Sequence, residues 1–344
     1  MNAASSIEPL ECRIAPAAIV INLADLTGAD GFDINGESNL DRFGSGVSGA
    51  GDVNGDGFDD LIIGAYGADP NGPDSGASYV IFGKPNGFGP TLDLSSLDGN
   101  NGFKILGEAA FDSSGRSVSG AGDVNGDGFD DLIIGAAGAD PNGPDSGASY
   151  VAFGKAGGFG ATLNLSSLDG TNGFKLQGGA ISDGSGFSVS GAGDVNGDGF
   201  DDLIVGAPHN VTFGSFPGES YVVFGKANGF GNTLNLESLD GTNGFKLQGE
   251  AAADATGWSV SAAGDINGDG FDDLIIGAPF ADPFGNYSGA IYVVFGKGNG
   301  FETTLALSSL DGTTGFKLEG GAGREYAGMS VSGAGDVMGT ASTT

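Results

Sequence analysis

The chain has 344 residues, with 44 Asp and Glu against 12 Lys and Arg, which gives a formal net charge of −32. This balance excludes a nucleic-acid-binding protein, which needs a basic surface, and the single cysteine, Cys12, excludes an intrachain disulfide. Seventy glycines exclude a mainly helical fold, because each glycine in a helix interior costs about 1 kcal/mol relative to alanine.

In chain order, residues 1–18 form a leader-like segment that we expect to be disordered, and a repeat occupies residues 19–344. The repeat is marked by the string GDVNGDGFDDLI, or GDINGDGFDDLI in the fourth copy, which begins at Gly51, Gly122, Gly193 and Gly264. Successive starts are 71 residues apart, and a fifth start at Gly335 soon departs from the pattern. The units are therefore 19–89, 90–160, 161–231 and 232–302, with a partial fifth unit at 303–344.

Each unit predicts four short strands, because runs of β-branched and aromatic residues are bounded by Gly, Asp, Asn and Pro. In the second copy we expect the first strand at Ser117–Gly122, the second at Asp131–Ala136 and the third at Ala148–Phe153. We take the fourth strand of this copy to be Gly102–Leu106, which lies earlier in the chain. The excess over an ordinary repeat length falls in the connection 84–101 and its copies.

A four-stranded unit cannot bury both faces alone, so neighbouring units must stack on it. Radial repetition of such sheets gives an all-β fold, a β-propeller with four-stranded blades, and a linear β-solenoid is the alternative. Four blades are complete. The fifth offers only a first strand near Val331–Gly335, and Gly31–Gly36 supplies a candidate outer strand. We therefore expect an incomplete propeller of the seven-bladed type, either a fragment of a larger ring or a partial ring that needs a partner.

The loop between the first and second strands carries the chemistry. In the first copy, oxygen side chains stand at loop positions 1, 3, 5 and 9, which are Asp52, Asn54, Asp56 and Asp60, and Gly57 at position 6 permits a sharp bend. With the Phe58 carbonyl at position 7, these groups form a hard-oxygen cage of the kind that Ca²⁺ prefers. The other predicted sites are Asp123, Asn125, Asp127, Phe129 and Asp131; Asp194, Asn196, Asp198, Phe200 and Asp202; and Asp265, Asn267, Asp269, Phe271 and Asp273.

A simpler interpretation is that Asn-Gly and Asp-Gly only form turns. That interpretation leaves four acidic residues crowded into nine positions, where their repulsion disfavours folding unless a cation intervenes. The loop is not an EF-hand, because position 12 is a strand residue, Ile63 in the first copy, in place of Glu. We therefore expect about four Ca²⁺ ions, with Asp59 and its copies at position 8 pointing away from the metal.

The pattern Dx[DN]xDGxxD followed by LIIGA resembles the FG-GAP repeats of integrin alpha-chain N-terminal propellers and their bacterial relatives. The resemblance covers residues 20–344 and implies a seven-bladed propeller with Ca²⁺ in the hairpin loop. The dipeptide Phe-Gly survives at Phe43-Gly44, and Gly-Ala-Pro survives in the third and fourth copies, at Gly206 and Gly277. The equivalents of Phe-Gly elsewhere are Ser114-Gly115, Ser185-Gly186 and Thr256-Gly257.

Three further sets of residues vary or recur with the period. Loops between the second and third strands carry aromatic residues that suit either recognition or packing on the next blade: Phe213, Phe216, Phe280, Phe284 and Tyr287, beside His209. A variable position that opens each first strand is expected at the rim of the axial channel, where packing explains it more simply than a ligand does: Ser45, Arg116, Phe187, Trp258 and Met329. Eight periodic lysines are expected to protect outer strands or to pair with Asp.

No recurring nucleophile–base pair or phosphate-binding loop is present, so we expect a protein that is not an enzyme. The function predicted is a calcium-binding extracellular or cell-surface module for adhesion or protein interaction. A lectin-like carbohydrate-binding propeller and an accessory domain of a larger secreted enzyme are the alternatives. The expected partner is an extracellular protein or glycan, not nucleic acid. No apolar run approaches the roughly 18 residues of a membrane helix, so no transmembrane segment is expected.

Sites suited to ~10⁻⁴–10⁻³ M Ca²⁺ fill outside cells, which favours an extracellular location. The opening segment from Ile7 to Pro16 also resembles the short leader of large bacterial surface proteins.

Overall fold

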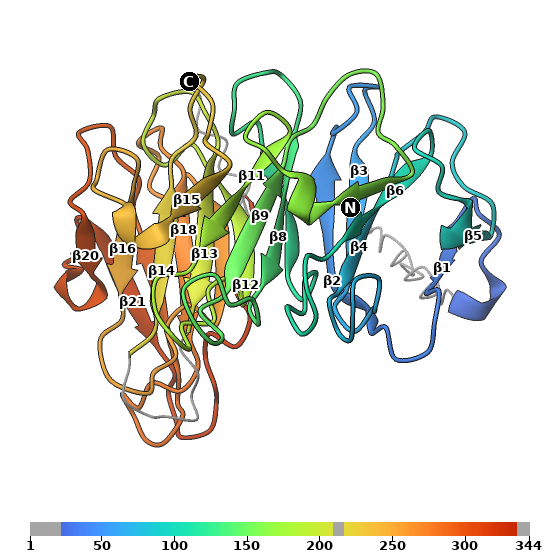
Figure 1. Cartoon of the computed structure of the whole chain (residues 1–344). Helices are drawn as coiled ribbons and strands as arrows, with labels where there is room; N and C mark the ends of the chain where they lie inside the picture. The colour runs from blue at the N-terminus through green and yellow to red at the C-terminus, as the bar shows by residue number, and fades with distance from the viewer. Residues whose placement is uncertain (1–21, 209–216, 336–344) are drawn as a thin grey trace, which may run out of the picture.

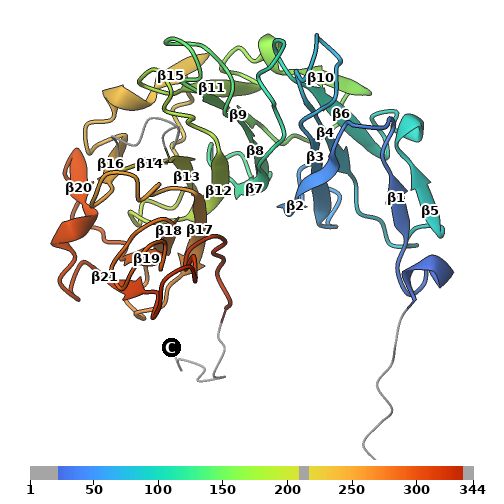
Figure 2. The ribbon, with the colours of Figure 1, turned by 90° about the horizontal axis from the view of Figure 1, so that it is seen from below.

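The computed structural model describes residues 22–208 and 217–335. The predicted leader at 1–18 and the loop residues His209, Phe213 and Phe216 lie outside these ranges. The described chain is all-β, and Figure 2 shows its sheets fanned around an open arc, with β2, β7, β12 and β17 on the concave side. These are the blades of a β-propeller, as predicted, and the linear solenoid is not what the chain forms. No helix in the described part is long and apolar enough to cross a membrane.

Four antiparallel blades repeat one order of strands from the inside outward (Figure 1). They are β2 (Phe43–Gly51), β3 (Asp60–Ala65), β4 (Ala77–Ile81) and β6 (Gly102–Leu106); β7 (Val118–Gly122), β8 (Asp131–Ala136), β9 (Ala148–Ala152) and β11 (Gly173–Gln177); β12 (Ser188–Gly193), β13 (Asp202–Ala207), β14 (Glu219–Val223) and β16 (Gly244–Gln248); and β17 (Ser259–Gly264), β18 (Asp273–Ala278), β19 (Ala290–Val294) and β21 (Gly315–Glu319).

The prediction that Gly102–Leu106 joins the sheet of the second copy is wrong. That segment, β6, pairs with β4 of the first blade, with Val80 opposite Phe103, and β9 pairs instead with β11. Each blade therefore takes its fourth strand from the following 71-residue unit, which links consecutive blades covalently and topologically. The strands themselves form where they were predicted, because their apolar runs bury on both faces, as β8 does along its whole length.

The segment that lengthens each unit forms a short extra strand and a 3-10 turn. The strands β10 (Thr162–Asn164), β15 (Thr233–Asn235) and β20 (Thr304–Ala306) pair in parallel with β6, β11 and β16 of the preceding blade. The outer edges of the first three blades are thereby covered, which removes an exposed strand edge from each, whereas the sheet of the fourth blade ends at β21. The turns that follow extra strands are η2 (Leu94–Ser96), η3 (Leu165–Ser167), η5 (Leu236–Ser238) and η6 (Leu307–Ser309), and η1 (Leu23–Asp25) lies near the start.

The ends of the described chain differ from the middle. The candidate outer strand at Gly31–Gly36 does form, as β1 (Asp33–Asn35), which pairs in parallel with β5 (Thr91–Asp93). The strand expected near Val331–Gly335 is not formed. The backbone at Gly333 nevertheless lies close to the inner strand of the fourth blade, since a β-carbon placed on Gly333 would lie 2.9 Å from the Ala262 carbonyl. Gly120 approaches the Gly49 carbonyl of the preceding blade in the same way.

The hydrophobic core lies between blades. One buried cluster joins Ile62 and Phe103 of the first blade to Leu132, Ile134 and Tyr150 of the second. The second and third blades, and the third and fourth, are joined by equivalent clusters. Blade stacking therefore supplies the burial that one sheet cannot supply for itself.

Candidate functional sites

The four acidic loops lie between the first and second strands of each blade, as predicted. Within the first loop, the Asp52 carboxylate accepts hydrogen bonds from the backbone N–H groups of Gly55, Asp56 and Gly57, at 2.8–3.0 Å. The Asn54 amide donates to Asp56 Oδ2 at 3.1 Å, so the side chains of loop positions 1, 3 and 5 gather on one side of the bend. In the other three loops, the position-1 carboxylate accepts the same hydrogen bonds from the loop backbone.

The position-9 aspartate is buried at the start of the second strand. Asp60 is 1% exposed, and its two carboxylate oxygens accept hydrogen bonds from the backbone N–H groups of Val53 (3.1 Å) and Gly83 (2.8 Å). Burial, with a smaller contribution from the carboxylates of Asp56 and Asp52, raises the pKa of Asp60 to about 7, against the effect of these hydrogen bonds. Burial likewise raises the pKa of Asp131 and of Asp202 to about 8, and it also raises the pKa of Asp273.

The donor set fits a hard cation such as Ca²⁺. Each loop supplies only carboxylate, amide and carbonyl oxygens, and the pKa of its buried carboxylate is raised partly by two neighbouring carboxylates, which a divalent cation would offset. Within residues 22–208 and 217–335, no three His, Cys, Asp or Glu side chains are already arranged to hold a metal ion. The side chains instead bond the loop backbone, and calcium binding stays a prediction.

Position 8 has a role that the sequence did not reveal. Asp130 Oδ2 accepts a hydrogen bond at 2.7 Å from the backbone N–H of Asp52 in the preceding blade, and Asp201 and Asp272 bond Asp123 and Asp194 in the same way. Each of the first three acidic loops is therefore tied to the loop of the next blade. The strict recurrence of Asp-Asp at positions 8 and 9 indicated a role for position 8, but the partner of this side chain could not be predicted without the arrangement of the blades.

Position 7 strengthens this link. The Phe129 ring lies so close to Gly55 of the preceding loop that a side chain there would come within 2.3 Å of it. Phe200 and Phe271 approach Gly126 and Gly197 equally closely. Gly55 has a φ of 74°, so glycine is required at this position both for its backbone conformation and for space.

The periodic lysines were expected to protect outer strands or to pair with Asp, and the ion pairs that they form among the described residues are with glutamates. Lys175 forms an ion pair with Glu108 at 2.7 Å, and the Tyr150 hydroxyl donates to the same carboxylate at 2.6 Å. In the other lysine register, Lys155 Nζ lies 4.9 Å from the centre of the Phe159 ring. Both registers therefore stabilise the outer part of the blades.

The connections between second and third strands meet those between fourth and first strands at the end opposite the acidic loops, as expected. The backbone bridges Gly76 to Ser114 and Gly147 to Ser185 join them. Of the aromatic residues in these loops, Phe284 and Tyr287 are 62% and 46% exposed, whereas Phe280 contacts Trp258 edge to face at 5.2 Å. Phe280 therefore packs on the residue that opens the inner strand of its own blade, and Phe284 is open to solvent.

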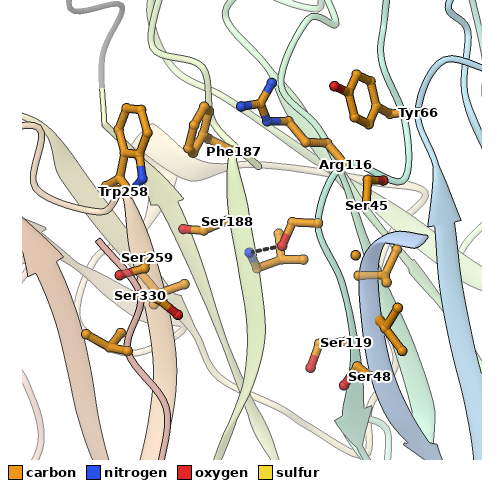
Figure 3. Close-up of a pocket in the computed structure, with 17 residues that line it drawn as sticks. Ser45, Ser48, Tyr66, Arg116, Ser119, Phe187, Ser188, Trp258, Ser259 and Ser330 are labelled. Atoms are coloured by element: carbon orange, nitrogen blue, oxygen red, sulfur yellow. Dashed lines mark hydrogen bonds between the residues drawn. The ribbon is translucent and has the colours of Figure 1, made fainter. Parts of the chain in front are cut away.

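The concave side of the arc holds a cavity of about 680 Å³ lined by the inner strands β2, β7, β12 and β17. Four of the five residues predicted at the rim of the channel line this cavity, namely Ser45, Arg116, Phe187 and Trp258, and Met329 does not. Figure 3 shows Tyr66, Arg116, Phe187 and Trp258 in a row along one side of the cavity, with serine side chains farther along the strands.

Comparison with known proteins agrees with this architecture. The model of the FG-GAP repeat matches residues 43–81, 114–152, 185–223 and 256–294, each of which runs from the inner strand through the acidic loop to the third strand. Within those matches lie the acidic residues of all four loops.

Curated proteins similar to this chain include integrin alpha chains. Integrin alpha pat-2 of Caenorhabditis briggsae is 30% identical over 52% of this chain, and integrin alpha-2 of Mus musculus is 36% identical over 28%. Phosphatidylinositol-glycan-specific phospholipase D of Bos taurus is 32% identical over 54% of this chain. The alignments cover 14%, 8% and 21% of the length of these relatives. The chain is therefore an FG-GAP repeat protein that resembles integrin alpha chains.

Proposed function

We propose that this chain is a calcium-binding, non-catalytic propeller module that mediates adhesion or protein interaction outside the cell or at its surface. The observation that carries the calcium part is the fourfold loop, in which hard-oxygen side chains at positions 1, 3 and 5 gather on one bend. Similarity to integrin alpha chains supports the adhesive part.

Calcium in these loops would act as a structural ion. Each acidic loop is bonded to its neighbour through position 8, so an ion that fixes one bend also fixes the attachment point of the next blade. An ion bound only by the folded chain adds about 2.7 kcal/mol of stability when its concentration is 100 times Kd. Extracellular Ca²⁺ is in the range that such modules use, which supports the proposed location.

Binding of the immobilised full chain to fibronectin, laminin and collagen tests the adhesive part. We expect at least one of these matrix proteins to bind in 1 mM Ca²⁺, and that binding to be lost in a chelator. The variant Asp56→Ala should weaken it, whereas Asp59→Ala, in the same loop but outside the ligand set, should not. Failure of all three to bind, or binding that a chelator leaves unchanged, would contradict the proposal.

The second candidate is an accessory module of a larger enzyme, which the phospholipase D relative favours. The alignment covers 21% of the length of that phospholipase, so the similarity concerns only one part of the enzyme. An accessory module, like an adhesive one, is expected to show no turnover of its own, so binding separates the two candidates: retention of the purified chain on phosphatidylinositol vesicles, without binding to the three matrix proteins, would favour the accessory module.

A further inference from the structure

The cavity on the concave side differs in charge from the rest of the molecule. The chain has a formal net charge of −32, yet none of the described residues that line the cavity is Asp or Glu. The one charged side chain among them is Arg116, which is exposed at the opening position of the inner strand region. A cationic lining in a strongly acidic protein favours an anionic ligand.

Aromatic rings hold Arg116 from both sides. Its guanidinium carbon lies 4.5 Å from the centre of the Phe187 ring and 5.7 Å from that of Tyr66. The row continues to Trp258, whose ring centre is 4.7 Å from that of Phe187, and on the other side Arg42 lies 5.0 Å from the Tyr66 ring. Figure 3 shows these side chains following one another across the blades.

This arrangement leaves the edge of the Arg116 guanidinium available. The contacts with the two rings use none of its five N–H donors, which lie in the guanidinium plane. Across the described parts of the chain, Arg116 forms no ion pair and its guanidinium donates no hydrogen bond to another residue. A carboxylate matches that edge with two parallel hydrogen bonds, which are among the stronger polar contacts in proteins.

Serine hydroxyls below the row present acceptors to the cavity. The hydroxyl proton of Ser188 is donated to the Gly257 carbonyl at 2.8 Å, and that of Ser119 to the Gly120 carbonyl at 2.7 Å. Ser259 donates in the same way to the Gly328 carbonyl at 2.8 Å. The oxygens of these residues therefore have lone pairs to offer but no proton, which suits a ligand rich in hydroxyl donors.

We propose that Arg116, held between Tyr66 and Phe187, binds the carboxylate of an acidic sugar residue in this cavity. The apolar face of the sugar ring packs on the Phe187 and Trp258 rings, and its hydroxyls donate to the serine oxygens of the inner strands. A peptide carboxylate would also fit the arginine, but the adjoining Phe187 and Trp258 rings offer apolar faces that suit the face of a sugar ring, and the row of serine oxygens matches its several hydroxyl donors, so the carbohydrate is the better match. The site lies on the inner strands, not in the acidic loops, and does not depend on the proposed calcium sites.

Fluorescence of Trp258, the one tryptophan in the sequence, provides the readout. The full chain in 1 mM Ca²⁺ is titrated with a hyaluronan tetrasaccharide, which carries glucuronic acid, and with its carboxyl-reduced, neutral form. We expect a saturable change with the acidic form and at least tenfold weaker binding of the neutral form. Equal binding of the two forms, or no saturable change together with no heat in calorimetry, would overturn the proposal.

Variants separate this site from non-specific binding. Arg116→Gln should weaken binding at least tenfold, since it removes a charge-assisted pair of hydrogen bonds. Arg116→Lys keeps the charge but loses the planar fork and should bind three- to tenfold more weakly than the unaltered chain. Arg324→Gln, which changes an arginine outside the cavity, should leave affinity within twofold.

Melting curves of each variant verify folding, and because Arg116 is exposed we expect its substitutions to leave the transition in place. Unchanged affinity in both Arg116 variants would overturn the proposal. Preferential binding of a tetraglutamate peptide over the sugar would also overturn it, because the ligand would then be a peptide.

Discussion

Aspartates in one loop have different roles because the fold places them at different depths. Asp127 lies in the exposed bend, Asp131 is 0% exposed at the start of β8, and Asp130 reaches across to the loop of the preceding blade. The spacing within the loop predicts Asp127 and Asp131 as ligands of one ion, and that role stays a prediction. The sequence could not predict the role of Asp130, because the partner of this side chain lies 78 residues away and is brought close only by blade stacking.

Replacing Asp130 by alanine should destabilise the chain. The variant removes the acceptor for the Asp52 N–H, and hydrogen bonds to charged groups contribute about 1.5–3 kcal/mol. Asp59→Ala is the matched control, because Asp59 occupies the same position of the first loop, is exposed and bonds no preceding loop. Urea unfolding of both variants measures the difference, and equal loss of stability in the two would show that the bond between loops contributes nothing.

Asp254 should make stability depend on pH. It is 7% exposed, accepts a hydrogen bond from the Ala251 N–H at 3.2 Å, and burial raises its pKa to about 6 from 3.8. Since the folded chain holds this proton more tightly than the unfolded chain, the contribution of Asp254 to stability is fully present below pH 3.8 and is lost as the pH rises through 6.

The unaltered chain should therefore gain stability relative to Asp254→Asn when the pH is lowered from 7 to 4.5. Urea unfolding of both proteins at the two pH values, in constant Ca²⁺, measures this difference. A difference between the two proteins that stays constant with pH would contradict the assignment.

Among the elements, the glycine near the end of each second strand determines how closely blades approach. A β-carbon placed on Gly135 of β8 would lie 2.0 Å from the Gly186 carbonyl, and the Gly135 carbonyl accepts a hydrogen bond from the Gly115 N–H at 2.9 Å. Gly64, Gly206 and Gly277 make the same approach in the other copies.

Gly135→Ala should cost about 3 kcal/mol of folding stability, because the clash is with backbone and the sheets must separate. Gly49→Ala serves as the control: Gly49 is in a strand without a positive φ, and nothing lies within 4 Å of its added carbon. Thermal melting distinguishes the two. Similar melting temperatures for both variants would mean that blades can separate there without loss.

The strands themselves were predictable from the sequence, and part of their pairing was not. Composition places a strand at Gly102–Leu106, but its choice of β4 as neighbour depends on how the connection from β4 folds back. The extra strand β10 and its copies were missed because three residues carry too little pattern.

The third copy lacks a glutamate that binds the blade tyrosine in the other copies, and a glutamate from another element takes its place. Glu37, Glu108 and Glu250 each bind the tyrosine hydroxyl of a blade, but Gly179 stands in this register of the third copy. There, Glu237 of η5 accepts from Tyr221 at 2.9 Å.

For the whole molecule, stability should come from the stacking of blades. Val118, Val189 and Val260 occupy one position of the inner strands and are 5–7% exposed, whereas Val47 in the first blade is 62% exposed. Val118→Ala should therefore cost about 2 kcal/mol, and Val47→Ala less than about 0.5 kcal/mol. Chemical denaturation tests this pair, and an equal cost at both sites would contradict a core located between blades.

Calcium uptake by the metal-free chain is the most direct test of the central claim that the acidic loops hold ions which connect neighbouring blades. Isothermal titration calorimetry of the full chain, combined with melting curves, should show about four Ca²⁺ ions bound and a melting temperature raised by many degrees. Asp56→Ala should remove one ion, and Asp59→Ala none. No heat of binding, together with identical melting in Ca²⁺ and in chelator, would contradict the account.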